Sequence, residues 1–209
     1  MNKLAIILTA LLISISASAA SAQSLPQVRL AEKEKTESGN KLSDQVSVTY
    51  NYIHNLGNFG DVYEPGTGVM FNYGFHIPES YLVVLRTGYY THKLKEGADT
   101  GYASFKVIPL HVGGRYYLSK DVFMPYFSFM NGLNFFMNSE SANGKEDESL
   151  IRYAFQLGFG FDVKFTKNFG INLNINYNNS FYDAGDIYTG QESAMTTGFE
   201  YSGGLSYFF

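Results

Sequence analysis

The sequence predicts an all-β protein, an eight-stranded antiparallel up-and-down transmembrane β-barrel. Three observations lead to this fold class. Apolar residues recur at every second position in eight segments, which is the period of a strand with two unlike faces. The connections between these segments alternate between short and long, as in barrels of the outer-membrane type. Beyond the first residues, no stretch approaches the roughly 18 consecutive apolar residues that indicate a transmembrane helix.

The segment 151–165 shows the two-residue period most clearly. Large apolar residues occupy every odd position from Ile151 to Phe165, whereas small, amide or charged residues occupy the even positions. The segment is longer than an ordinary strand of roughly 5–6 residues, and it is long enough to cross a bilayer obliquely. We expect its odd face to contact lipid and its even face to line a narrow polar interior.

The other strands follow the same rule, with two local irregularities. They are expected at residues 46–57, 69–77, 81–90, 105–118, 124–137, 171–178 and 199–209. In the fourth strand the apolar parity changes above Pro109, which predicts a β-bulge at this proline. In the fifth strand, Asn131 interrupts the apolar face.

The connections predict how the barrel is oriented. Short turns are expected at 78–80, 119–121 and 166–168, and long loops at 55–66, 93–101, 138–149 and 183–194. Outer-membrane barrels have short turns on the periplasmic side and long loops outside. Both ends of the barrel domain are therefore expected in the periplasm.

The first 22 residues have the composition of a secretory signal peptide. Lys3 is followed by an apolar run from Leu4 to Ile15, and Ala20 and Ala22 form a small-residue cleavage site before Gln23. The apolar run of about twelve residues is short against the roughly 20 that a helical span needs. We expect export to the outer membrane and removal of this segment.

Domain organisation follows from the change in composition after the signal peptide. Residues 23–44 are rich in both charges and poor in large apolar residues, so we expect a disordered periplasmic leader, with a short helix at 30–35 as the alternative. Residues 45–209 form the predicted outer-membrane barrel domain. The chain has no cysteine, which excludes a lipoprotein anchor and disulfides.

Net charge argues against nucleic acid as a partner. Removal of Lys3 with the signal peptide reduces the 15 basic residues to 14, against 19 acidic ones. No basic stripe is present to contact phosphates along a nucleic acid.

The polar faces of the strands indicate which side points inward. A soluble lipid-carrying barrel would also alternate, but its outer face would be rich in Lys and Glu. Here the polar faces carry mainly glycine, serine and asparagine, including the four asparagines at 172, 174, 176 and 178. An eight-stranded barrel is just wide enough to be filled by such side chains. We therefore expect a filled interior without a continuous water channel.

Five charged residues have inward parity, and we expect them to form an interior charge network because an unpaired buried charge is costly. They are Arg86, Arg115, Arg152, Asp162 and Glu200. Arg115 and Asp162 are expected at similar heights. The alternative use of these charges is a gated ion path.

Several stretches resemble the small outer-membrane β-barrel family that includes OmpX-like and OmpW-like proteins and the OmpA membrane domain, a porin-family barrel. They are 108–118 (IPLHVGGRYYL), 125–126 followed by 131–133, 157–177 (LGFGFDVKFTKNFGINLNINY) and 203–209 (GGLSYFF). The resemblance implies an architecture and carries no shared catalytic set. It also implies that Leu205, Tyr207 and Phe209 form the signal that the barrel assembly machinery reads during insertion.

Histidines and acidic loops offer weak candidates for chemistry. His54 and His92 lie near predicted outer loops that also contain Asp61 and Asp99, and a barrel protease or lipid-modifying enzyme would place such groups at that rim. No two histidines have metal-ligand spacing. We interpret the acidic residues of the 138–149 loop as a solvated loop; the alternatives are binding of divalent cations near lipopolysaccharide or contact with a host or phage surface. These acidic residues are Glu140, Glu146, Asp147 and Glu148. We expect no catalytic site, metal or cofactor.

The predicted function is structural, or an interaction at the cell surface through the extracellular loops. The alternative is a narrow OmpW-like channel for small hydrophobic molecules, which would need a hydrophobic cavity near Tyr90, Met130 and Phe136. An outer-membrane lipid-modifying enzyme or protease is a third alternative. The expected partners are outer-membrane lipid, lipopolysaccharide and the assembly machinery, and a monomer is expected.

Overall fold

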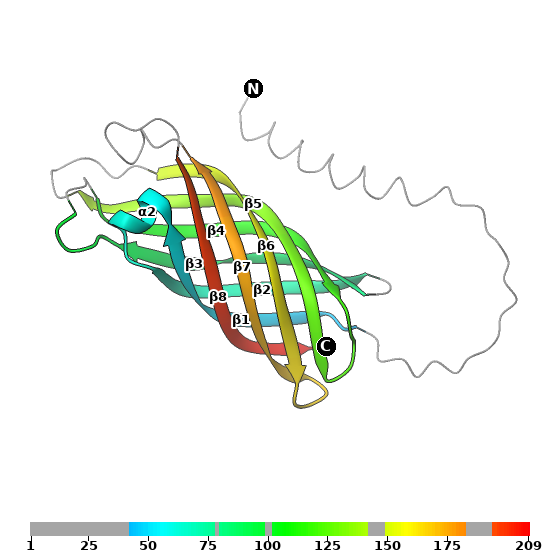
Figure 1. Ribbon diagram of the computed structural model, residues 1–209. Helices are drawn as coiled ribbons and strands as arrows, with labels where there is room; N and C mark the ends of the chain where they lie inside the picture. Colours follow the sequence, from blue (N-terminus) through cyan, green and yellow to red (C-terminus); the bar gives the residue numbers. More distant parts are fainter. Residues whose placement is uncertain (1–41, 78–79, 99–101, 142–148, 183–193) are drawn as a thin grey trace, which may run out of the picture. The chain divides into compact units, whose positions relative to one another are not determined.

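The protein is a closed barrel of eight antiparallel strands in which each strand pairs with its neighbours in sequence (Figure 1). The computed structural model describes residues 42–77, 80–98, 102–141, 149–182 and 194–209. The strands are β1 (Gln45–Leu56), β2 (Gly66–Ile77), β3 (Tyr81–Lys93), β4 (Tyr102–Tyr117), β5 (Phe123–Ser141), β6 (Ser149–Lys164), β7 (Phe169–Tyr182) and β8 (Ala194–Phe208). The predicted fold class is confirmed.

Pairing of β1 with β8 closes the barrel. Gln45 lies opposite Phe208 at one end of this pair, and Leu56 lies opposite Thr197 at the other. Closure gives each of the eight strands a paired neighbour on both sides, which is what a strand protein needs in hydrocarbon. Among the described residues, no helix is both long and apolar enough to span a membrane.

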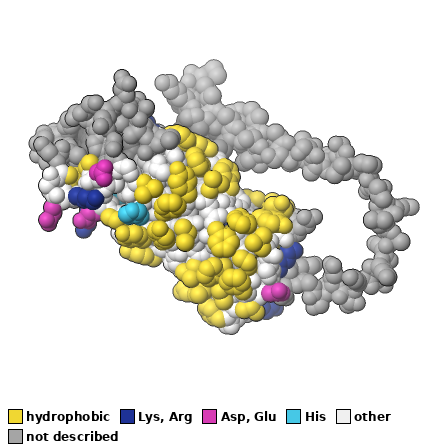
Figure 2. Space-filling model, viewed as in Figure 1, with side chains coloured by type: hydrophobic (Ala, Val, Ile, Leu, Met, Phe, Trp, Pro, Cys, Tyr) yellow, Lys and Arg dark blue, Asp and Glu magenta, His cyan; other side chains and the backbone are white. Residues whose placement is uncertain are grey.

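The outward face of the barrel is apolar over most of its height. In Figure 2, hydrophobic side chains cover the middle of the visible face and charged side chains lie toward its two ends. Leu205 is 65% exposed and Val48 is 52% exposed, although both would be core residues in a soluble protein. Along β6, Leu157 and Phe159 are exposed whereas Gln156 and Asp162 are buried. The apolar faces therefore point outward and the polar faces inward, as predicted.

The predicted bulge at Pro109 is wrong. Thr87 lies opposite Leu110 and Tyr90 lies opposite Val107, so the register of β4 against β3 is the same on both sides of the proline. Val107 is fully buried and keeps the inward parity of β4. The apolar parity changes in the sequence because the upper lumen is itself apolar, which makes an inward residue there look like an outward one.

Asn131 interrupts the apolar face of β5, as expected, without disturbing the strand. It pairs with Val112 and Phe155, two outward positions, and the β5 register against β4 continues without interruption. The strand simply carries one amide on its outward side.

A short helix, α2 (Gly57–Val62), occupies part of the predicted loop 55–66. It lies at the end of the barrel where the connections are longer (Figure 1). Phe59 and Tyr63 are 4% and 1% exposed, and they pack with Val107 and Phe136 in an apolar cluster to which Tyr90 and Leu94 contribute. The helix thus covers the lumen from within the first long connection.

At the opposite end, the last residues of the predicted leader belong to the fold. Leu42 is buried in an apolar cluster with Leu82 and Phe208. The Phe209 backbone N–H donates to the Asp44 carbonyl at 2.9 Å, and the His76 N–H donates to Asp44 Oδ1 at 2.7 Å. The predicted signal peptide and the predicted leader as far as residue 41 lie outside the described residues.

Candidate functional site: the polar interior

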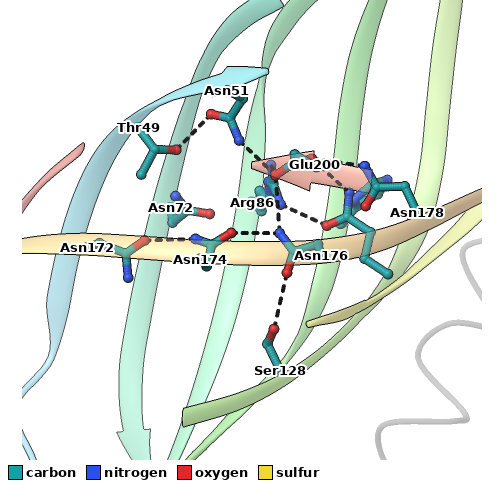
Figure 3. Close-up of polar contacts among 12 residues, drawn as sticks. Thr49, Asn51, Asn72, Arg86, Ser128, Asn172, Asn174, Asn176, Asn178 and Glu200 are labelled. Atoms are coloured by element: carbon teal, nitrogen blue, oxygen red, sulfur yellow. Dashed lines mark hydrogen bonds and ion pairs between the residues drawn. The ribbon is translucent and has the colours of Figure 1, made fainter. Parts of the chain in front are cut away.

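Glu200, near the middle of β8, is the centre of a buried hydrogen-bond cluster in the lumen (Figure 3). Only 1% of its surface is exposed, and Arg86 of β3 forms an ion pair with it through Nη2 and Oε1. Arg86 Nη1 also donates to Gln156 Oε1 of β6 at 2.7 Å. A buried carboxylate and guanidinium satisfy each other here, so neither charge is left uncompensated.

Side-chain amides supply the remaining donors to Glu200. Asn51 Nδ2 donates to Oε1 at 2.7 Å, and Asn178 Nδ2 donates to Oε2 at 3.1 Å. Asn176 Nδ2 lies 3.2 Å from Oε1. These residues converge because β8 lies between β1 and β7, with Glu200 opposite Ile53 on one side and Asn176 on the other. Hydrogen bonds to an ionised acceptor are the stronger kind.

The inward asparagines of β7 form a ladder that leads from Glu200 toward the short-turn end of the barrel (Figure 3). Asn176 Nδ2 donates to Asn174 Oδ1 at 2.8 Å, and Asn174 Nδ2 donates to Asn172 Oδ1 at 2.9 Å. Residues two apart in a strand point to the same side, so alternate asparagines reach one another. An amide has both a donor and an acceptor, which lets the ladder continue without a charge.

The ladder ends at a second buried carboxylate, Asp162 of β6. Asn172 Nδ2 donates to Asp162 Oδ1 at 2.8 Å, and the Tyr117 hydroxyl donates to Asp162 Oδ2 at 2.6 Å. Arg115 Nη1 lies 4.0 Å from Asp162 Oδ2, which is ion-pair distance but too long for a hydrogen bond. The Arg115 guanidinium instead lies 4.6 Å above the ring of Tyr126, a cation–π contact.

The asparagine ladder links four of the five charged residues expected in one network. Arg86 contacts Glu200, and Arg115 lies near Asp162. The fifth, Arg152, is half-buried nearer the α2 end, where its Nη1 donates to the Ile151 carbonyl at 3.1 Å. Sequence reasoning did not identify Asn51, Gln156 and Tyr117 as partners of the carboxylates. Inward parity was their only signal, and parity does not give relative height across non-adjacent strands.

The α2 end of the lumen is closed by packed rings. The rings of Phe59 and Tyr63 stack with centroids 4.7 Å apart, and the Phe59 and His92 rings are nearly perpendicular with centroids 5.2 Å apart. His92 Nδ1 lies 2.9 Å from Asn55 Nδ2. Lys95 Nζ donates to the Gly60 carbonyl at 2.6 Å, which ties α2 to the residues after β3.

Below α2 lies a cavity of about 30 Å³, bordered by Tyr90, Phe136, His92 and Gln156 among others. A volume of this size holds one or two water molecules, at about 10–15 Å³ for each. A second void, of about 10 Å³, lies between Arg86 and Arg115. Met130, expected beside Tyr90 and Phe136, packs instead in the apolar cluster at the short-turn end. The cavity of about 30 Å³ among these described residues is too small for a hydrophobic ligand.

The two rim histidines lie on opposite sides of the barrel wall. His92 points inward and is 3% exposed, whereas His54 is exposed and shares the outward parity of Tyr50 and Tyr52. Asp61 is exposed on α2, and Asp99 lies outside the described residues. The described residues contain no group of three or more histidine, aspartate or glutamate side chains that could hold a metal ion. The side chains at 140 and 146–148 are not described.

The expected assembly signal forms an outward apolar row at the end of the chain. Leu205 and Phe209 are 65% and 64% exposed. The Tyr207 ring lies 5.1 Å from the rings of both Phe169 and Phe209. The expected cleavage residues Ala20, Ala22 and Gln23 lie outside the described residues.

Comparison with known proteins gives both a family and a fold. Residues 7–209 match the family model of the outer membrane protein β-barrel domain. No curated protein matches the sequence. Neisserial surface protein A is similar in structure, with 16% sequence identity and a TM-score of 0.59 over 79% of this chain and 97% of that one.

Two further solved structures align with this chain at lower TM-scores. Ail of Yersinia pestis has 15% identity and a TM-score of 0.49 over 80% of this chain and 97% of its own. Outer membrane protein W of E. coli has 16% identity and a TM-score of 0.48 over 84% and 100%. The family match covers nearly the whole chain, and the barrel has the closed topology that the family name describes. The chain therefore belongs to the outer membrane protein β-barrel domain family.

Proposed function

We propose that this outer-membrane barrel acts at the cell surface through the loops at its α2 end, as a structural or interaction protein with a closed lumen. The observation that carries the proposal is the filled interior. The Glu200 and Asp162 clusters and the asparagine ladder occupy the lumen, and α2 covers one end of it. Two spaces among the described lumen residues have volumes of about 30 and 10 Å³. In a barrel whose lumen is filled, the loops are the part of the molecule best placed to bind a partner.

Bilayer recording of the purified full chain tests this proposal against a conducting role. We expect no steady conductance, because packed side chains fill the described part of the lumen. A large and steady conductance would overturn the closed lumen. The narrow channel for small hydrophobic molecules is the second candidate, but a cavity of about 30 Å³ gives it little support. Binding of a hydrophobic probe in the lumen would revive it.

The proposal includes an orientation, with residues 1–22 removed on export, both barrel termini in the periplasm and the longer connections outside. The contrast between the short connections after β4 and β6 and the longer ones after β1, β3, β5 and β7 supports it. The chain has no cysteine, so single cysteines report position cleanly. We expect Glu96→Cys to react with an impermeant thiol reagent on intact cells, and Lys120→Cys to react only after the outer membrane is opened. The reverse pattern would overturn the orientation.

The partners follow from the same proposal. The barrel assembly machinery would read Leu205, Tyr207 and Phe209 as an outward apolar row, of which Leu205 and Phe209 are exposed and Tyr207 is half-buried. Lipid and lipopolysaccharide would surround a monomeric barrel, and no nucleic acid would be bound. We further propose that the protein is not an enzyme, since His54 and His92 do not share a site. A Phe209→Ala variant should assemble poorly in cells, and normal assembly would remove this residue from the signal.

A further inference from the structure

Two lysines lie on the outward face of adjacent strands near the α2 end. Lys106 of β4 has the parity of Leu110 and Tyr116, which are exposed, whereas the intervening Val107 and His111 are buried. Lys93 of β3 has the parity of Leu85 and Tyr89, again the outward side. Neither lysine points into the lumen, so the interior charge clusters do not account for them.

The register of β3 and β4 makes these lysines neighbours. Lys93 lies opposite Ser104, and Thr91 lies opposite Lys106. Lys93 and Lys106 are therefore a diagonal pair on one face, a relation that places Cα atoms about 7–8 Å apart. Long flexible side chains at this spacing can direct both ammonium groups to one anion. In the described part of the chain, neither lysine takes part in an ion pair.

The height of the pair on the barrel points to a lipid headgroup. Tyr81 and Tyr116 pair at the short-turn end with ring centroids 4.9 Å apart, and tyrosines favour a membrane interface. On β4, Lys106 lies ten positions before Tyr116, in the direction of the α2 end. At about 3.3 Å per residue and a tilt of about 40°, ten residues rise about 25 Å, the height of the apolar band of such barrels.

The residues below the pair are suited to lipid chains. Tyr89 and Leu110 are exposed, and Ile108 is half-buried on the same outward surface. A lysine at the edge of this surface can lay its aliphatic stem along it and place its charge at the interface. The surface therefore has a charged upper edge above an apolar wall, which matches a lipid with an anionic headgroup better than it matches a soluble anion.

We propose that Lys93 and Lys106 bind a phosphate group of lipopolysaccharide in the outer leaflet. The inference rests on the orientation proposed above, which places the α2 end outside. A lysine near an anionic lipid surface contributes about 1 kcal/mol. Loss of both lysines should therefore weaken binding about 30-fold, the equivalent of about 2 kcal/mol at 1.4 kcal/mol per tenfold.

Native mass spectrometry of the full chain in detergent tests the site with diphosphoryl lipid A as the probe. The variant is Lys93→Gln with Lys106→Gln, and the matched control is Lys120→Gln with Lys167→Gln at the short-turn end. We expect about 30-fold weaker binding of the probe by the variant and a change of less than about twofold in the control. Monophosphoryl lipid A should bind more weakly than the diphosphoryl form to the unaltered protein.

Equal binding by the unaltered protein and the Lys93/Lys106 variant would overturn the site. Equal losses in the variant and the control would also overturn it, because they would show attraction to overall charge. The cysteine labelling described above separates this result from the proposed function. Labelling of Glu96→Cys on intact cells without selective lipid A binding leaves the orientation standing and removes the lipid site. Labelling of Glu96→Cys only after the outer membrane is opened would contradict the proposed orientation. It would then also exclude a partner in the outer leaflet.

Discussion

At the residue scale, the interior shows how a narrow barrel can enclose charges. Glu200 and Arg86 are 1% and 5% exposed; Glu200 accepts hydrogen bonds from several amides besides Arg86, and Arg86 also donates to Gln156. Taking a charged group out of water costs several kcal/mol. Amide donors from three other strands offset that cost at Glu200. We therefore expect the pair to stabilise the barrel only when both Glu200 and Arg86 are present.

Replacing Glu200 by glutamine tests this dependence. Glu200→Gln keeps the shape of the side chain but leaves Arg86 buried beside a neutral group, so we expect the free energy of unfolding to fall by about 3 kcal/mol. Urea unfolding of the protein in lipid vesicles, followed by circular dichroism, measures it. The double variant Arg86→Gln with Glu200→Gln restores neutrality and should be less destabilised than the sum of the single variants. Additive losses would contradict the coupling.

Glycine has a second role at this scale, because it makes room on the crowded lumen wall. A Cβ added at Gly160 would lie 2.6 Å from the Tyr126 hydroxyl oxygen and 2.7 Å from the Leu173 carbonyl oxygen. We expect Gly160→Ala to destabilise the barrel by about 2 kcal/mol in the same unfolding measurement.

The control for Gly160→Ala is the outward glycine of β8. At Gly203 a Cβ would meet only the end of the Leu173 side chain, at 2.8 Å. This group can move aside into the lipid, so Gly203→Ala should change stability by less than about 0.5 kcal/mol. Equal losses at the two positions would show that crowding of the lumen is not the cause.

At the scale of elements, α2 is the segment that covers one end of the barrel lumen. Its buried rings pack on Val107 of β4 and Phe136 of β5, far from α2 in sequence. Backbone hydrogen bonds reinforce the closure, since the Lys95 N–H donates to the Val62 carbonyl at 3.0 Å. The helix is short, so its stability comes from these contacts and not from its own propensity.

Removal of the Phe59 ring should therefore release α2 without unfolding the barrel. Phe59→Ala is expected to destabilise the closed arrangement by about 3 kcal/mol, which increases the open population about 100-fold. Hydrogen exchange at the Tyr63 amide, which donates to the Phe59 carbonyl, should accelerate by that factor. Asp61→Ala on the exposed side of the same helix is the control. A global loss of barrel stability in Phe59→Ala would contradict the assignment of α2 as a separable cover.

The elements that the sequence could predict are the strands in which apolar residues recur strictly at every second position. Segment 151–165 carries eight outward apolar residues without interruption, and its strand is found at Ser149–Lys164. The period failed where the lumen is apolar, as at Val107, and in the connection that folds into α2. Both depend on contacts between segments far apart in sequence, which no local pattern contains. For the same reason, parity placed Arg86 and Glu200 inside but did not show that Asn51 and Gln156 would surround them.

At the scale of the whole molecule, one assignment of sides explains the composition, the closed sheet and the filled lumen together. Exposed Leu205 and Val48 and buried Asp162 would be reversed in a soluble barrel. In a bilayer this distribution is favourable, because the outward apolar side chains contact lipid and the inward polar side chains contact one another. The surface role, the closed lumen and the lysine site all depend on this assignment.

Nuclear Overhauser contacts between methyl groups and lipid acyl chains test the assignment most directly. The full chain in nanodiscs offers matched pairs: Leu205 and Val48 are 65% and 52% exposed on the outward face, and Leu82 and Val84 are each 1% exposed in the lumen. We predict strong contacts from the acyl methylenes to Leu205 and Val48 and none to Leu82 and Val84. Acyl-chain contacts to Leu82 and Val84, with none to Leu205 and Val48, would contradict the account.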